Sequence, residues 1–230
     1  MSTPRRDFLG WLGASTLFAA AGAPLAAAPL AAAPRRGPSP GPQPVSSEWE
    51  MGWVDRLTGK YRAVFDGPAV SEGDVLFRAV MWRKQHNEVY KTDPADLNAV
   101  VVIRHEAIPL AMNDEYWATY GVGKETRMKD PRTKKWMTVN PIRATPPDTP
   151  PRWADYSLER FLEQGGIVLA CNIAFGMIVH NVATKEKLKD RDAAVARAKT
   201  MLIPGIVLQP SGVFAVLRAQ EAGCNYILAS

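Results

Sequence analysis

The sequence predicts an α/β fold, a three-layer α/β/α sandwich in which helices cover both faces of a mainly parallel, five-stranded sheet. Two observations favour this fold. From about residue 60 to the end of the chain, short apolar runs alternate with longer segments of helical periodicity. Several runs are apolar at almost every position, as expected for strands covered on both faces. With 47% hydrophobic and 22% charged residues, the chain has enough apolar side chains for one sizeable core.

The strands are predicted from their composition. Each is a short run of apolar residues, most of them rich in β-branched or aromatic side chains, and is bounded by glycine, proline or polar residues. The second is continuously apolar and is therefore expected at the centre of the sheet. The predicted strands are 60–67 (KYRAVFDG), 97–103 (LNAVVVI), 167–170 (IVLA), 206–209 (IVLQ) and 225–229 (NYILA).

The helices are predicted from apolar residues at helical spacing and from signals at their ends. Ser71 is expected to cap the first helix, and Asp93-Pro94 ends it. Pro109 suits the first turn of the second. Gly165-Gly166 closes the third, and Pro204-Gly205 stops the fifth. The predicted helices are 72–91, 109–120, 153–164, 172–183, 185–202 and 211–222.

Residues 121–152 break this alternation. They contain six prolines and the basic cluster KDPRTKKW, and a small hairpin is expected around Lys134–Val139. A loop of this length in a compact domain is usually functional or disordered. Two interpretations stay open, a lid over a site and a surface excursion or oligomer contact.

The N-terminal region has the features of an export signal. The twin arginines Arg5 and Arg6 precede Phe8 and Leu9, and an alanine-rich apolar segment with small-residue cleavage sites follows. This pattern resembles the twin-arginine export motif, so residues 1–33 are predicted to direct the protein to the periplasm or outside the cell. The alternative is an uncleaved membrane anchor, but prolines and a weakly apolar composition disfavour a stable span.

After the signal, residues 34–48 are predicted to form a Pro/Ser/Gly linker and residues 49–230 a single domain. Removal of the signal takes away two arginines and one aspartate, which lowers the net charge from +5 to +4. The sequence has no long Lys/Arg stripe with interleaved aromatic residues, so a nucleic-acid partner is not expected.

Polar and reactive residues follow three of the predicted strands. In an open parallel sheet, ligands bind just beyond the carboxyl ends of the strands. Since these ends meet at one edge, the residues that follow them are candidates for a common site. The candidates are Arg104 and His105 after the second strand, Cys171 and Asn172 after the third, and Ser211 and Gly212 after the fourth.

Cys171 would lie at the start of a helix, where the macrodipole and free backbone N–H groups stabilise a thiolate. It is therefore a candidate sulfur nucleophile or persulfide carrier, and the alternative is a small buried hydrophobic residue. Cys224 precedes the last strand. If that strand is parallel, the two cysteines lie at opposite edges, about 17 Å apart along a strand, which is too far for a disulfide. Cys224 is expected to be structural.

The three histidines do not form a recognisable motif. His105 could act as a general base, a proton relay or a metal ligand, or it could hold a turn. His180 lies nine residues after Cys171, half a turn out of phase, so a pair on that helix is excluded. His86 is expected to pack on its helix. CxxC, HExxH, P-loop and GxGxxG motifs are absent, so neither a metal site nor a cofactor is predicted.

Three stretches together resemble the DsrE/DsrF-like family, which includes sulfur-relay subunits. They are LNAVVVIRHEAIPLAMND, FLEQGGIVLACNIAFG and LIPGIVLQPSGVFAVLRAQEAGCNYILAS. The likeness covers about residues 58–229 except the proline-rich excursion. It implies a three-layer α/β/α domain that forms a homo-oligomer, a trimer or hexamer. It also implies that Cys171 stands where relay proteins carry a persulfide, although FGMIVH follows here where those proteins often have an Arg-Gly pair.

Two functions follow from these observations. The first is an exported protein that handles sulfane sulfur through a persulfide on Cys171, with His105 in the same cleft or across a subunit boundary. The alternative is a non-catalytic module that binds a small ligand or acts as an oligomeric partner, with the basic loop 124–135 contacting a protein or an anion. Whether the chain is an enzyme stays open at this point.

Overall fold

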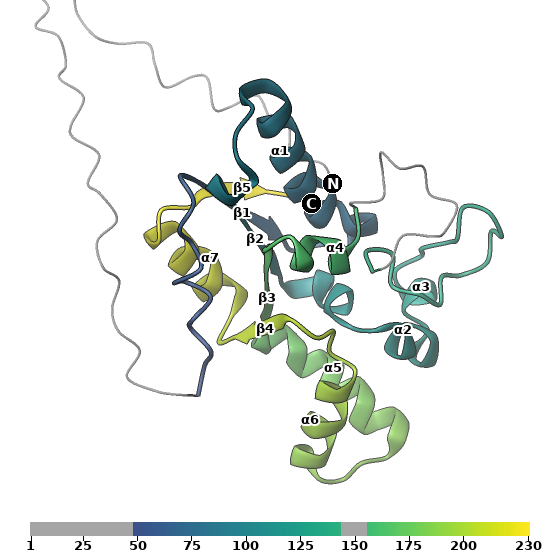
Figure 1. Ribbon diagram of the computed structural model, residues 1–230. Coiled ribbons are helices and arrows are strands. Elements are labelled where there is room, and N and C mark those ends of the chain that lie inside the picture. The colour runs from purple at the N-terminus through teal and green to yellow at the C-terminus, as the bar shows by residue number, and fades with distance from the viewer. Residues whose placement is uncertain (1–47, 144–155) are drawn as a thin grey trace, which may run out of the picture. The chain divides into compact units, whose positions relative to one another are not determined.

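The structure is a computed structural model that describes residues 48–143 and 156–230. Its centre is a five-stranded, all-parallel sheet with the order β4-β3-β2-β1-β5, which confirms the predicted α/β fold (Figure 1). The predicted export signal, the linker up to Ser47 and residues 144–152 of the excursion lie outside the described residues. The strands are β1 (Tyr61–Gly67), β2 (Leu97–Ile103), β3 (Ile167–Cys171), β4 (Ile206–Gln209) and β5 (Asn225–Leu228).

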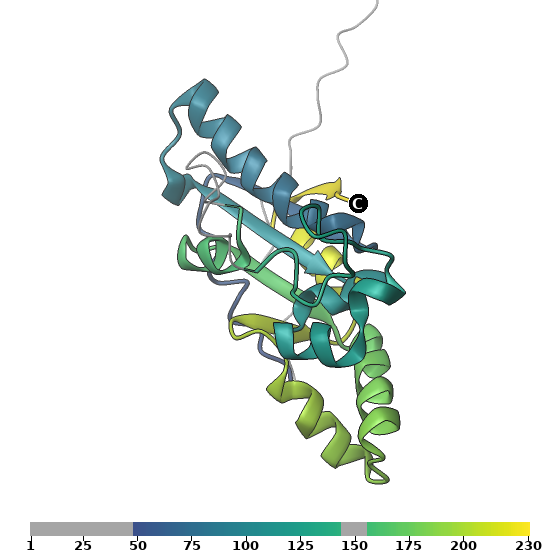
Figure 2. The same cartoon turned by 90° about the vertical axis from the view of Figure 1, so that its right-hand side faces the viewer.

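Helices cover both faces of this sheet. Helix α7 lies on one side, and α1, α4 and α5 lie on the other (Figure 1). Both views show α5 and α6 side by side beyond β4, the edge strand (Figures 1 and 2). The α-helices are α1 (Asp74–Tyr90), α2 (Asp114–Tyr120), α3 (Val122–Glu125), α4 (Leu158–Glu163), α5 (Asn172–Glu186), α6 (Arg191–Thr200) and α7 (Gly212–Glu221), and the 3-10 helices are η2 (Ser71–Gly73), η3 (Pro94–Asp96) and η4 (His105–Ala111).

The order of the strands places a reversal of the chain's direction between β3 and β4. From β1 to β4 the chain advances in one direction, and it then crosses through α7 on the opposite face to reach β5. Helix α5 therefore leaves β3 on one face, whereas α7 leaves the neighbouring β4 on the other. A reversal of this kind between adjacent parallel strands opens a crevice at their carboxyl ends, where ligands bind in open α/β sheets.

Two apolar layers hold the sheet between its helices. Val64, Val102 and Leu169 point towards α7 and pack with Trp53, which precedes β1. The residues between them along the strands, such as Phe65, belong to the layer under α1 and α5. This alternation within strands that are buried on both faces is what the continuous apolar runs predicted.

Four helix starts differ from the sequence prediction. Helix α4, predicted from residue 153, begins at Leu158 after Ser157, whose Oγ accepts the Arg160 N–H at 3.2 Å. The predicted helix over 109–120 is wrong before residue 114. Residues 109–111 belong to η4, and α2 begins after Asn113, whose Oδ1 accepts the Tyr116 N–H at 3.1 Å. Ser71 does not cap α1, because Gly73 takes that position with a φ of 90°. Helix α6 begins after Asp190, whose carboxylate accepts two backbone N–H groups. In α2 and α6, a side chain that caps directly outweighed apolar periodicity.

The described part of the proline-rich excursion, residues 121–143, packs against the domain. Asn140 is buried, and its Nδ2 donates to the carbonyl oxygens of Leu110 and Met112 at 2.8 and 2.7 Å. A single antiparallel bridge joins Lys129 and Trp136, slightly before the expected hairpin. This part of the excursion is therefore anchored by a buried side chain rather than held by surface contacts alone.

Candidate functional site

A row of polar side chains crosses the carboxyl edge of the sheet. Register pairs Cys171 with Gln209, and it pairs Ala170 with Ile103, so that Arg104, the next residue, lies beside Cys171. One strand further, Asp66 lies near the end of β1, and Tyr226 of β5 reaches it. We call Gln209, Cys171, Arg104, Asp66 and Tyr226 the edge row. Strands β3, β2 and β1 thus bring together the thiol, a cation and a carboxylate.

Cys171 is the N-cap of α5. Its Sγ accepts the backbone N–H of Ala174 at 3.4 Å, and 7% of the residue is exposed. A negative charge on this sulfur would interact favourably with the helix N-terminus. The thiol is thus placed at a strand end, in contact with an amide and with little open surface around it.

Arg104 is held by a bidentate ion pair with Asp66, a buried carboxylate. Its Nε and Nη2 donate to Oδ1 and Oδ2 at 2.7 and 2.8 Å, and the Tyr226 hydroxyl donates to Oδ2 at 3.0 Å. The hydrogen bond to Asp66 raises the pKa of Arg104, and the charge of Cys171 contributes in the same direction. The pKa of Tyr226 is also raised, by desolvation first and then by its bond to Asp66. The guanidinium of Arg104 is therefore paired with Asp66, and it places a positive charge close to Cys171.

Ser211 and Gly212 serve the start of α7. The Ser211 Oγ accepts the Phe214 N–H at 3.0 Å and caps the helix. A Cβ atom at Gly212 would lie 2.5 Å from the Cβ of Arg104, so only glycine allows this close approach. Both residues lie at the predicted edge, and their contacts give them a structural role there.

His105 and Asn172 are exposed at the same edge. His105 begins η4 with a φ of 53°, and within the described residues its side chain has no recorded hydrogen bond or ion pair. The structure therefore does not join His105 to Cys171. Asn172 opens α5 and lines a cavity, which is described below.

Sequence reasoning missed three members of the edge row. Asp66 and Gln209 are polar residues inside apolar strand segments and are 2% and 0% exposed, and this interruption is a signal that could have found them. Tyr226 has no comparable signal. Gln209 donates from Nε2 to the Glu50 carbonyl at 2.9 Å, but its buried Oε1 has no partner in the part of the chain that the structure describes.

Cys224 lies at the opposite edge of the sheet, because β5 is parallel to its neighbours. Both cysteines are free, as predicted. Desolvation raises the pKa of the Cys224 thiol to about 11, and the charge of Arg62 opposes this shift. Cys224 packs with Ala219 and Ala222 of the α7 side, which fits a structural role.

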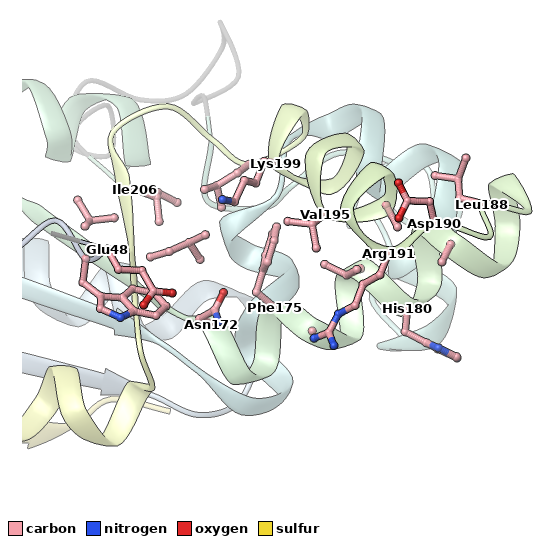
Figure 3. A pocket seen from close by; sticks show the side chains of 18 of the residues that line it. Glu48, Asn172, Phe175, His180, Leu188, Asp190, Arg191, Val195, Lys199 and Ile206 are labelled. Atoms are coloured by element: carbon pink, nitrogen blue, oxygen red, sulfur yellow. The ribbon is translucent and has the colours of Figure 1, made fainter. Parts of the chain in front are cut away.

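A cavity of about 860 Å³, which we call the α5–α6 groove, begins next to the edge row. It is bounded by α5, α6, β4 and residues 48–50, and Asn172 lies between Glu48 and Phe175 along it (Figure 3). Apolar side chains form much of its surface. They are Phe175, Val179, Ala183, Leu188, Ala194, Val195, Leu202, Ile206, Val207 and Leu208.

Within the ranges 48–143 and 156–230, no group of three or more His, Cys, Asp or Glu could hold a metal ion. No helix in these ranges is both long and apolar enough to cross a membrane. Comparison of the chain with protein-family models gave no match, and comparison with curated proteins gave none either. The likeness to the DsrE/DsrF-like family therefore stays a prediction.

Proposed function

We propose that the protein is exported to the periplasm or beyond and handles sulfane sulfur through a persulfide on Cys171. The observation that carries this proposal is the position of the thiol. Its Sγ accepts an amide N–H at the start of α5, and the Arg104 guanidinium lies at the neighbouring position of the edge row. Both features favour negative charge on sulfur, which a nucleophilic thiol needs.

The proposed step balances without an added oxidant. With thiosulfate as donor, the Cys171 thiolate attacks the outer sulfur, a new S–S bond forms, and the S–S bond of thiosulfate breaks. Sulfite leaves with the electron pair of that bond. A thiol acceptor then attacks the outer sulfur of the persulfide and releases the Cys171 thiolate, by the same chemistry as thiol–disulfide exchange.

The size of the donor follows from burial. With 7% of Cys171 exposed, a small sulfur species such as thiosulfate or polysulfide is a better fit than a bulky disulfide. His105 is exposed on the same edge and belongs to the proposal as a proton relay that acts in a complex, because in the described part of the chain no hydrogen bond joins its side chain to the thiol.

The proposal includes a homo-oligomer, a trimer or hexamer as in the DsrE/DsrF-like proteins. Large apolar side chains are exposed near both helix starts at the edge. They are Ile173 and Met177 on α5, and Val213, Phe214 and Leu217 on α7. Exposed apolar residues that gather in this way are typical of surfaces that another subunit covers.

The alternative function is a non-catalytic module that binds a small ligand or acts as an oligomeric partner. The α5–α6 groove supports it, because the cavity has the size of a ligand site and does not include the thiol. On this alternative, Cys171 is only the cap of α5.

The test is to treat the full chain with thiosulfate or polysulfide and to map persulfides by mass spectrometry. We expect a gain of one sulfur atom on Cys171, its loss in Cys171→Ser, and an unchanged adduct in Cys224→Ser. The free thiol content is measured first, so that prior oxidation is not mistaken for lack of reaction. A reduced Cys171 that gains no sulfur at any donor concentration would leave only the binding module.

A further inference from the structure

The α5–α6 groove combines an apolar floor with charges that the protein does not neutralise. Its volume of about 860 Å³ lies within the usual range of small-molecule sites, which are mostly apolar with a few polar groups. We propose that this groove binds a small molecule with an apolar body and one anionic group.

The floor is made by three elements that meet at the edge of the sheet. Phe175 of α5, Val195 of α6 and Ile206 of β4 face the same cavity (Figure 3). Since β4 is an edge strand, no further strand of the sheet covers this side. An aromatic or aliphatic body placed there would remove the exposed part of these side chains from water.

The cations come from one face of α6. Arg191, Val195 and Lys199 are four residues apart, and this spacing places them on the same side of the helix. Figure 3 shows Arg191 and Lys199 on either side of Val195. Lys189, just before the helix, lines the groove as well. The α6 wall is therefore apolar in its middle and cationic at both ends.

These cations have no recorded ion pair or hydrogen bond from their side chains among the described residues, whereas a cation elsewhere on α6 is fully engaged. Arg197 binds Glu186 and Glu115. On the acidic side, the Asp190 carboxylate is occupied by the N–H groups at the start of α6. The other acidic residues of the lining are exposed, and both lie in the segment that bounds the groove on another side. They are Glu48 and Glu50.

The cations of the groove, which are unpaired among the described residues, therefore favour a ligand with an anionic group. An anionic group next to Arg191 or Lys199 would gain a partner that the chain does not supply, while its apolar body lies on Phe175 and Val195. The proposal does not depend on Cys171, which is outside the lining, and it goes beyond sulfur transfer.

The probe for the test is 8-anilinonaphthalene-1-sulfonate, which has an aromatic body and one sulfonate. Fluorescence and calorimetric titration of the full chain should give saturable binding of one probe per chain that weakens as salt rises. The double variant Arg191→Gln/Lys199→Gln should weaken the affinity about tenfold or more, and the charge-matched control Lys60→Gln/Lys124→Gln should leave it within about twofold.

Two further variants separate the possible causes. Val195→Trp fills the groove and should abolish saturable binding, with folding checked by circular dichroism. Cys171→Ser should bind the probe like the unchanged chain, whatever its effect on persulfide formation, so that failure of one proposal is distinguished from failure of the other.

Several results would overturn the inference. The first is the absence of saturable binding to the unchanged chain. The second is an equal loss of affinity in the groove double variant and in its control. Binding that appears only on dilution, as sedimentation shows an oligomer dissociating, would assign the groove to a second copy of the chain. Binding that appears only after proteolysis before Trp49 would assign it to the N-terminal segment.

Discussion

The two cysteines are the same residue type at opposite ends of the sheet, and their surroundings differ in kind. Cys171 follows β3 and accepts an amide at the N-terminus of α5. Cys224 precedes β5, and its backbone N–H donates to the Ala219 carbonyl at the C-terminal end of α7. One sulfur therefore lies at the positive end of a helix dipole and the other at the negative end.

An arginine near each thiol does not remove this difference. Arg104 lies beside Cys171, and Arg62 acts on Cys224 while it donates to the Ala222 carbonyl at 2.9 Å. Desolvation still raises the pKa of Cys224 to about 11. Cys171 is 7% exposed and Cys224 is 6% exposed, so the degree of burial does not decide which thiol is suited to chemistry. The position relative to strand and helix ends distinguishes them.

The largest expected effect on stability comes from Asp66, which holds Arg104 beside Cys171. Asp66→Ala leaves Arg104 and the Tyr226 hydroxyl without their shared acceptor, and we expect a loss of about 3–5 kcal/mol in the free energy of unfolding. Urea denaturation measures it. The control Asp74→Ala breaks an exposed pair with Arg78 and should cost less than about 1 kcal/mol. Equal losses would show that the edge row is not a buried network.

The second effect is a pH dependence that belongs to Cys224. Its folded pKa of about 11 lies above the ordinary thiol pKa of 9.0, so the unfolded chain loses the proton first as the pH rises. Stability is therefore expected to fall between about pH 9 and 11, by up to about 3 kcal/mol. The difference between the unchanged chain and Cys224→Ala isolates this contribution from lysines and tyrosines. Parallel stability curves for the two proteins would contradict it.

A smaller effect concerns the stability of alanine and serine variants, whose order should be reversed between Cys171 and Cys224. Cys171→Ala removes the acceptor that caps α5 and should cost about 1 kcal/mol, and Cys171→Ser, which can cap, should restore it. At Cys224, serine should be the worse substitution, since its hydroxyl would be buried among apolar groups at a cost of about 1–3 kcal/mol. Thermal unfolding of the four variants gives both comparisons, and the same order of alanine and serine at both sites would remove the distinction.

Local sequence signals predicted the strands well and the helix starts less well. The apolar runs predicted all five strands to within a residue or two. For β2 and β3 the reason is burial on both faces, whereas β5 is mostly exposed and was predicted from its apolar composition. Periodicity placed helix starts too early where Asn113 and Asp190 cap. Periodicity along the sequence could not predict the contact between Asp66 and Tyr226. That contact depends on the pairing of β5 with β1, which the crossover through α7 brings about.

The candidate site was predicted to a similar extent. The direction of the strands brought Arg104, Cys171 and Ser211 to one edge, and the structure places them there. The sequence did not indicate that Arg104 is already paired, since its partner Asp66 lies 38 residues away on another strand. It also did not predict the α5–α6 groove, which arises from the packing of two helices against an edge strand.

The most direct test of the central claim compares the two thiols within one molecule. The native full chain is treated with iodoacetamide near neutral pH, and the alkylation rates of Cys171 and Cys224 are followed by peptide mapping. The account predicts that Cys171 reacts at least about tenfold faster, because its Sγ lies at the start of α5 beside Arg104, while burial raises the pKa of Cys224. Equal rates, or faster reaction of Cys224, would contradict it.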